Sequence, residues 1–259
     1  MKSFRHFAAL LFICLFVAVP PDTRAEPSSS GASPRVDPKA LELLKRMSST
    51  LGSTKAFTYR ARSVIEVPAR TGQYITLFSS AEVSLKRPDK LRARLSGEAP
   101  HFDFYFNGST ASAFAPGGKV YSVAEAPSTI DAMLPELQRE TGIRFISAPL
   151  LFSNPYEVLT RGLTSGMVVG STTVHGIPCE HLAFRSLGVN WEIWIESGRR
   201  ALPWRLAATF TDRTNFPRTV VEFVSWNLSP WLRSGDFVFR KPAGAREIPF
   251  LSVIGPSAR

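Results

Sequence analysis

The strongest constraint on the fold is a change in hydrophobic spacing about fifty residues into the chain. From there onward apolar and polar residues alternate, as in DKLRARLSG (residues 89–97), where three apolar residues flank Arg92 and Arg94. Alternation with a period of two is typical of a β-strand with one buried face. Such runs recur to about residue 227 with turn residues between them. The sequence therefore predicts successive antiparallel strands with one wet face.

Two stretches have helical spacing instead. In the first, Asp37 suits an N-cap, Pro38 the first helical position and Gly52 a C-terminal cap. The second, residues 128–162, separates two sets of strands and predicts one or two short helices broken by prolines. A sheet with one apolar face needs a cover. We therefore expect an α+β fold, mainly antiparallel, in which a strongly curved sheet or open barrel of about eleven strands has helices across its mouth.

The first 25 residues have the composition of an export signal. Lys2 and Arg5 precede an apolar run of thirteen residues, Phe7 to Val19, which is too short to span a bilayer as a helix. The small residues of TRA favour cleavage after Ala25, which places the mature chain in the periplasm. The expected organisation is a signal peptide at 1–25, a flexible linker at 26–36 and one domain at 37–259, with a helical lid insertion at about 128–162.

Cysteine content and charge narrow the range of partners. Cleavage removes Cys14 and leaves Cys179 as the single cysteine, so no intramolecular disulfide is expected. The whole chain has a formal net charge of +10, but its basic residues are scattered singly or in pairs, as on a solvated strand face. We therefore expect no nucleic-acid partner, and an anionic membrane surface or lipid headgroup fits the charge better.

The stretch HGIPCEH, residues 175–181, contains metal-ligand residue types at close spacing. If Ile177–Pro178 forms the loop between two strands, His175 and His181 face each other across a hairpin with Cys179 nearby. Zinc takes three or four such ligands, and no other region offers an obvious fourth. The favoured interpretation is an ordinary hairpin with a buried Cys179, and we expect neither a metal nor a cofactor.

Sequence patterns of catalysis are missing. The chain has no G-x-S-x-G, H-E-x-x-H or P-loop motif. Glu192 and Glu196 lie four residues apart in one strand, roughly 13 Å, which is too far for a glycosidase pair within that strand. We therefore expect a protein that is not an enzyme. An uncharacterised enzyme or metal protein centred on His175, Cys179 and His181 remains an open alternative.

From Asp37 onward the chain resembles a family of predicted periplasmic proteins that is known only as a domain of unknown function. The family is grouped with the LolA/LolB lipoprotein-carrier superfamily. The motifs that carry the resemblance cover almost all of the mature chain and include KRPDKLR, FYFNG, LFSNPYEVL, VHGIPCEHLAFR, NWEIWIESGRRALPWRL and FVFRKPAGAREI. The resemblance implies a half-open β-barrel of about eleven strands with helices plugging the opening, and it implies no established activity.

Binding or carriage of a hydrophobic ligand, either a lipid or the acyl chains of a lipoprotein, is the leading functional hypothesis. An open barrel with a helical lid holds an acyl chain where its interior is not filled by side chains. Ordinary core packing is the competing interpretation of the same aromatics. The resemblance leaves a further alternative, an envelope protein-interaction or stress-sensor module like RseB. The candidate cavity residues are Phe102, Phe104, Phe106, Leu134, Leu137, Leu150, Leu151, Phe152 and Trp191.

Overall fold

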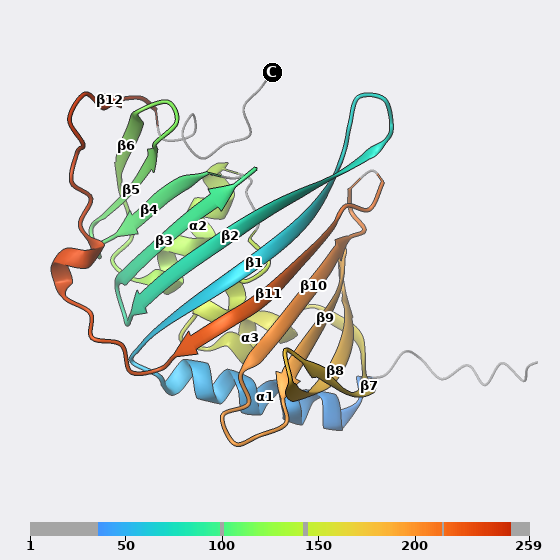
Figure 1. Ribbon diagram of the computed structural model, residues 1–259. Helices are drawn as coiled ribbons and strands as arrows, with labels where there is room; N and C mark the ends of the chain where they lie inside the picture. Colours follow the sequence, from blue (N-terminus) through green and yellow to red (C-terminus); the bar gives the residue numbers. More distant parts are fainter. Residues whose placement is uncertain (1–35, 99–100, 142–144, 214, 250–259) are drawn as a thin grey trace, which may run out of the picture. The chain divides into compact units, whose positions relative to one another are not determined.

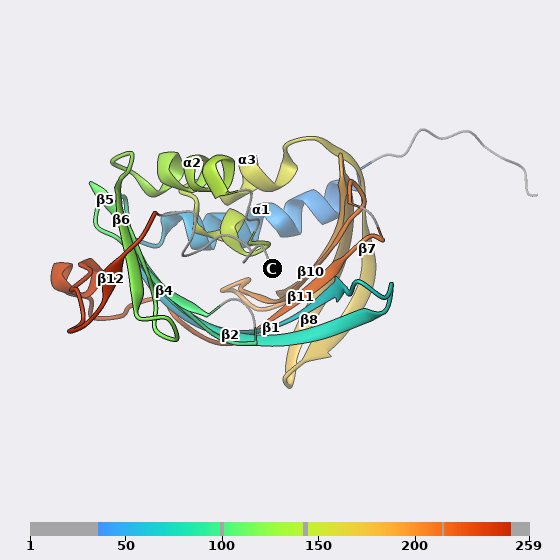
Figure 2. The same ribbon diagram turned by 90° about the horizontal axis from the view of Figure 1, so that it is seen from above.

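The computed structural model describes residues 36–98, 101–141, 145–213 and 215–249. The chain divides into two units, residues 1–33 and 34–259, and every described residue belongs to the second. One large curved sheet dominates this unit, and the helices lie against its concave face (Figures 1 and 2). The predicted signal peptide lies outside the described residues, as does the predicted linker except for Val36.

Twelve strands form this sheet in the part of the chain that the structure describes. The strands are β1 (Ala56–Pro68), β2 (Tyr74–Lys86), β3 (Lys90–Gly97), β4 (Phe102–Phe106), β5 (Thr110–Ala115), β6 (Val120–Glu125), β7 (Leu163–Val174), β8 (Ile177–Ser186), β9 (Val189–Glu196), β10 (Pro203–Phe210), β11 (Arg218–Asn227) and β12 (Arg246–Glu247). Their order is β12-β6-β5-β4-β3-β2-β1-β11-β10-β9-β8-β7. Among these twelve described strands, β12, two residues long, is the one that pairs in parallel with its neighbour, and an isolated parallel bridge joins Val36 to Gly166 of β7.

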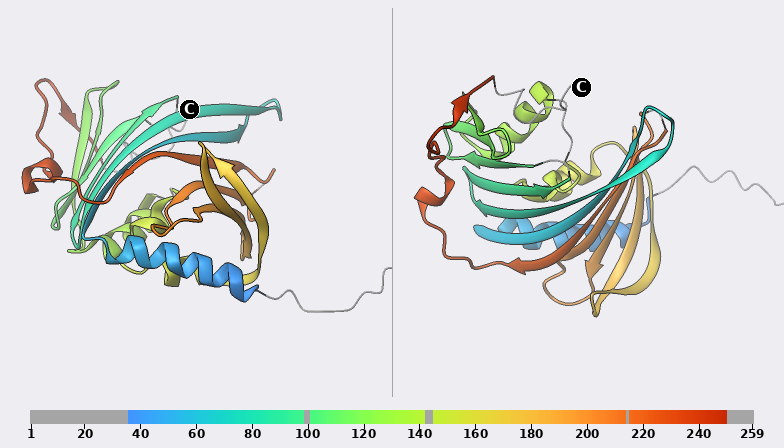
Figure 3. Two further views of the ribbon diagram at one scale, coloured as in Figure 1. Left: turned by 60° about the horizontal axis from the view of Figure 1, so that its bottom comes forward. Right: turned by 45° about the horizontal axis from the view of Figure 1, so that its top comes forward.

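The alternation in the sequence explains this sheet. In β4 the side chains of Phe102, Phe104 and Phe106 are buried while the two residues between them are half-buried. Strand β1 pairs with β11, the last long strand of the chain, at the centre of the sheet, so the two strand sets form one surface. The views in Figure 3 show how strongly that surface curves without its edges meeting. The predicted half-open barrel is confirmed, with twelve strands where about eleven were expected.

Helix α1 (Pro38–Ser53) lies across the concave side. Its start is fixed by Asp37, whose side chain accepts a hydrogen bond of 2.8 Å from the backbone N–H of Lys39. Leu44, Met47 and Leu51 share one face at helical spacing and are fully buried. The predicted first helix is therefore confirmed, but the predicted cap at Gly52 is wrong, because the helix continues through Gly52 to Ser53 and Thr54 is its C-cap.

The segment between the two strand sets supplies the rest of the cover. It contains α2 (Ile130–Thr141), the 3-10 helix η1 (Ala148–Leu151) and α3 (Pro155–Thr160), which lie over the concave face in Figure 2. Pro135 lies inside α2, whereas prolines open η1 and α3. Among the described residues no helix is long and apolar enough to cross a membrane.

The core fills the centre of the concave face. Tyr59 lies 4.9 Å from Trp226 and 5.3 Å from Phe223, between ring centroids, and Phe57 and Phe223 are fully buried. A final segment contains η2 (Ser234–Phe237) and β12. It packs Phe239 on the convex side against aromatic residues of β4, β5 and β6. The concave face is thus packed at its centre, and space remains toward β9 and β10.

Candidate ligand cavity

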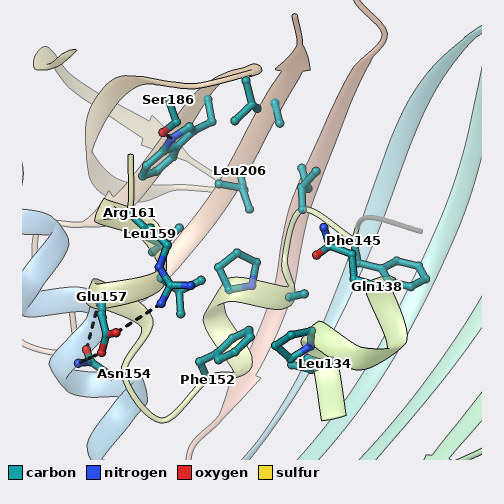
Figure 4. A pocket seen from close by; sticks show the side chains of 18 of the residues that line it. Leu134, Gln138, Phe145, Phe152, Asn154, Glu157, Leu159, Arg161, Ser186 and Leu206 are labelled. Atoms are coloured by element: carbon teal, nitrogen blue, oxygen red, sulfur yellow. Dashed lines mark hydrogen bonds and ion pairs between the residues drawn. The ribbon is translucent and has the colours of Figure 1, made fainter. Parts of the chain in front are cut away.

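A cavity of about 710 Å³ lies between the helical insertion and the concave face of β9 and β10 (Figure 4). Leu206, Ala208 and Phe210 come from alternate positions of β10, so they share one face. Trp191 joins them because it pairs with Ala208 across the sheet. From the insertion side the apolar part of the wall includes Leu134, Pro135, Leu137, Phe145, Ile146, Pro149, Phe152, Val158 and Leu159.

Polar groups gather at the α3 side of this cavity. Arg161 forms an ion pair of 3.4 Å with Glu157 (Figure 4), and both side chains are largely exposed. Asp131 accepts a 2.9 Å hydrogen bond from the backbone N–H of Ser153, which joins α2 to the segment after η1. A mostly apolar wall with a few polar groups on one side suits a ligand that has an apolar body and a polar end.

A second, smaller cavity of about 80 Å³ lies on the other side of α2. On the sheet side its wall is formed mainly by apolar residues of β2, β3 and β4, including Phe102 and Phe104. On the insertion side Phe145 packs edge-on against Phe102, with 6.4 Å between the ring centroids. Leu134, Leu137, Phe145 and Ala148 line both cavities. These four side chains therefore form the partition between two parts of one concave space.

The candidate residues from the sequence are distributed over both spaces. Leu134 and Leu137 line both cavities, Phe152 and Trp191 the larger one, and Phe102, Phe104 and Leu151 the smaller one. Phe106 and Leu150 are fully buried and line neither of these two. The structure brings the first seven together around the insertion, and it places the other two in packed core. Their role in binding stays a prediction.

Sequence reasoning missed the β10 side of the larger cavity. Leu206, Ala208 and Phe210 alternate in LPWRLAATF, which is the signal for one shared face. The alternation does not predict whether that shared face packs against side chains or borders a cavity. The cavity depends on the pairing of β10 with β9 and on the position of the insertion, which is distant in sequence.

The HGIPCEH hairpin exists, but its turn was placed wrongly. Val174 pairs with Ile177, so His175 and Gly176 form the two-residue turn and Ile177–Pro178 begins β8. Both turn residues have positive φ, +50° and +78°, which matches a turn suited to the twist of paired strands. No three histidine, cysteine or acidic side chains among the described residues are placed to hold a metal ion.

The two remaining side chains of that stretch have ordinary structural surroundings. Cys179 is fully buried, and burial raises the pKa of its thiol. The ring of His181 stacks on Trp194 at 4.0 Å between centroids. Its Nε2 atom lies 3.0 Å from Oε2 of Glu192.

The carboxylate of Glu192 joins three strands on the convex face. Its Oε1 accepts a 2.8 Å hydrogen bond from Arg218 on β11, while its Oε2 lies beside His181 on β8. Burial alone would raise the pKa of Glu192, but the hydrogen bonds to Arg218 and His181 outweigh burial, so this pKa is lowered.

A lowered pKa of Glu192 makes its contribution to stability depend on pH. Such a carboxylate stabilises the fold above its unfolded pKa of about 4.3, and this contribution disappears as pH falls through the folded pKa. We expect Glu192→Gln to lower the free energy of unfolding by up to about 1 kcal/mol at neutral pH and to have almost no effect near pH 3. Urea unfolding at both pH values checks this. The control is Glu42→Gln, an exposed α1 residue with no ion pair among the described residues.

Arg87, at the end of β2, anchors the cover. Its Nη1 donates to the carbonyl of Leu151 at 2.8 Å, and its Nη2 donates to the carbonyls of Phe152 at 2.7 Å and Leu51 at 3.3 Å. One guanidinium therefore connects the sheet to both η1 and the last turn of α1. Leu151 and Phe152 line the two cavities, so this anchor also positions cavity wall.

A comparison with family models gives one match, over residues 40–251, to the family described as "Predicted periplasmic protein (DUF2092)". The chain belongs to this family. The resemblance seen in the sequence motifs is thereby confirmed, and with it the description of the family as predicted periplasmic proteins. No curated protein matches the chain.

Several solved structures are similar in fold. An uncharacterized conserved protein from Thermus thermophilus is 12% identical with a TM-score of 0.48, covering 81% of this chain and 98% of that one. Lipoprotein LppX of Mycobacterium tuberculosis is 13% identical with a TM-score of 0.46, covering 74% and 96%. A LolA-superfamily protein from Nitrosomonas europaea is 9% identical with a TM-score of 0.37, covering 77% and 97%. At such low scores these similarities support no inference about ligands or partners.

Proposed function

We propose that this protein binds or carries a hydrophobic ligand, a lipid or the acyl chains of a lipoprotein, in the cavity between the insertion and β10. The observation that carries the proposal is the 710 Å³ of space with a mostly apolar wall. Pockets for small apolar ligands have volumes of this order. The proposed location is the periplasm, after removal of residues 1–25.

The role that we propose is binding without catalysis. The cavity wall contains Asp131, Glu157 and Arg161, but Asp131 is hydrogen-bonded to Ser153 and the other two pair with each other. Asp131 therefore holds α2 to the segment after η1, whereas the Glu157–Arg161 pair on α3 is placed to meet the polar end of a ligand. Mass spectrometry under native conditions, followed by solvent extraction of protein purified from its own host, would identify the ligand. Repeated recovery of empty protein that also fails to take up added fatty acid would contradict the proposal.

Filling the cavity gives a direct test. Ala208 lies on the cavity face of β10 opposite Trp191, so Ala208→Trp places an indole in the proposed binding space. We expect the affinity for a fluorescent fatty acid to fall about tenfold or more, because part of the ligand loses its apolar contact. The control is Val224→Trp, which places the same indole at an exposed position of β11. Equal binding by both variants would place the ligand elsewhere.

An envelope protein-interaction role, like that of RseB, is the alternative proposal. It predicts a folded partner on the outside of the molecule and not a lipid within it. Crosslinking in the envelope followed by capture separates the two proposals. Recovery of a defined partner together with an empty cavity favours interaction, whereas bound lipid without a partner favours carriage.

A further inference from the structure

Three hairpin tips meet at one end of the curved sheet. The β8–β9 turn contacts the β10–β11 loop, because the carbonyl of Gly188 accepts a 3.0 Å hydrogen bond from the backbone N–H of Thr211. The β1–β2 tip contacts the same loop through the hydroxyl of Tyr74, which donates to the carbonyl of Asn215. We call residues 69–75, 185–188, 211–213 and 215–217 the hairpin rim. Figure 1 shows the long β1–β2 tip beside the β10–β11 tip at the upper right.

The hairpin rim exposes large apolar side chains. Leu187 is 92% exposed, Phe216 59%, Ile75 45% and Tyr74 43%. A two-residue turn such as Leu187–Gly188 has no structural need for leucine, since polar residues are the ordinary choice there. Several exposed apolar residues on touching loops form a patch of the kind that marks an interaction surface.

The charge of the rim indicates what the partner is. The rim contains Arg70, Arg185 and Arg213 against Asp212 as its one acidic residue, a net charge of 3 − 1 = +2. The Arg213 guanidinium lies 5.4 Å from the centroid of the Phe210 ring, so a cation and an apolar surface are adjacent. Apolar tips among arginines fit the boundary between anionic headgroups and acyl chains, where aliphatic groups insert and cations stay with the phosphates.

We propose that the hairpin rim docks on an anionic lipid surface, with Leu187 and Phe216 inserted and the rim arginines against the headgroups. Leu187 also lines the 710 Å³ cavity, so docking turns one end of the cavity wall toward the lipid. Passage of a ligand between the membrane and the cavity rests on the proposed function. Docking of the rim on lipid does not, because it needs no ligand in the cavity.

The test uses flotation of the purified protein with vesicles of phosphatidylcholine alone or mixed with phosphatidylglycerol. Wild-type protein is expected to float with the anionic vesicles and to be released by salt, because salt screens the arginines. Phe216→Asp is expected to weaken this binding about tenfold. Aspartate is suitable here because Phe216 has a φ of +46°, which aspartate tolerates. Val123→Asp is the control, since Val123 is 41% exposed on the distant strand β6.

Three outcomes would overturn docking: no flotation of the wild type, equal flotation with both vesicle types, or equal flotation of Phe216→Asp and wild type. A dimer of the wild type that Phe216→Asp converts to a monomer, with flotation unchanged, would assign the rim to a second copy of the chain. Fatty-acid binding in vesicle-free buffer tests the cavity separately. Wild-type protein that binds fatty acid and ignores vesicles would therefore contradict docking while leaving the proposed function intact.

Discussion

Replacing Arg87 with alanine should cost about 3–5 kcal/mol of unfolding free energy, which corresponds to a fall of about 10 °C in Tm. The substitution removes three hydrogen bonds from a charged donor and leaves the carbonyls of Leu51, Leu151 and Phe152 without this partner. Hydrogen bonds to charged groups contribute more than neutral ones, and a buried carbonyl left without a donor is costly. Thermal and urea unfolding followed by circular dichroism measure the effect.

A control and a second variant separate anchoring from general loss of charge. Arg94 lies on β3 with its side chain 50% exposed and pairs with Glu82 and Asp103, so Arg94→Ala should cost no more than about 1 kcal/mol. Arg87→Lys keeps the charge but not the planar fork that reaches several carbonyls. We expect this variant to fold and to bind a fluorescent fatty acid more weakly, because Leu151 and Phe152 are held less firmly. If Arg87→Ala has the same thermal and urea unfolding midpoints as wild type, other contacts hold the helices on the sheet.

The sheet and α1 could be predicted from the sequence because their signals are local. Alternation places Phe102, Phe104 and Phe106 on one face whatever the rest of the chain does, and Asp37–Pro38 marks a helix start by capping alone. The turn at His175–Gly176 was missed for a local reason. Gly176 and Pro178 both interrupt the strand pattern, and proline is a common turn residue, so the sequence alone does not show that the turn precedes Ile177.

The cavity could be predicted only in part, because emptiness is not a local property. Phe104 and Phe106 have the same signal, yet Phe104 meets the smaller cavity and Phe106 meets packed core. The difference depends on which part of the insertion lies opposite each strand. The three carbonyl acceptors of Arg87 come from positions 51, 151 and 152, and no spacing within KRPDKLR indicates them.

Leu137→Asp should abolish binding of a fluorescent fatty acid and lower the free energy of unfolding by about 1–3 kcal/mol. Leu137 is half-buried on α2 and lines both cavities. A carboxylate there loses the apolar contact of leucine and places a charge in the partition between the two spaces. Its cost to stability stays moderate because it faces an open cavity where water enters, whereas the ligand loses apolar wall on both sides of α2.

The control for Leu137→Asp introduces the same negative charge at an exposed position of the same helix. Ala132 is exposed in the first turn of α2, where an aspartate suits the helix dipole, so Ala132→Asp should bind ligand and unfold like wild type. Thermal melts and fatty-acid titrations on both variants distinguish three cases. Loss of binding with a moderate loss of stability supports the assignment of Leu137 to the wall of the ligand space. A large loss of stability, about 4 kcal/mol or more, indicates packed core with no ligand space. If Leu137→Asp matches wild type in both measurements, α2 does not cover the concave face in solution.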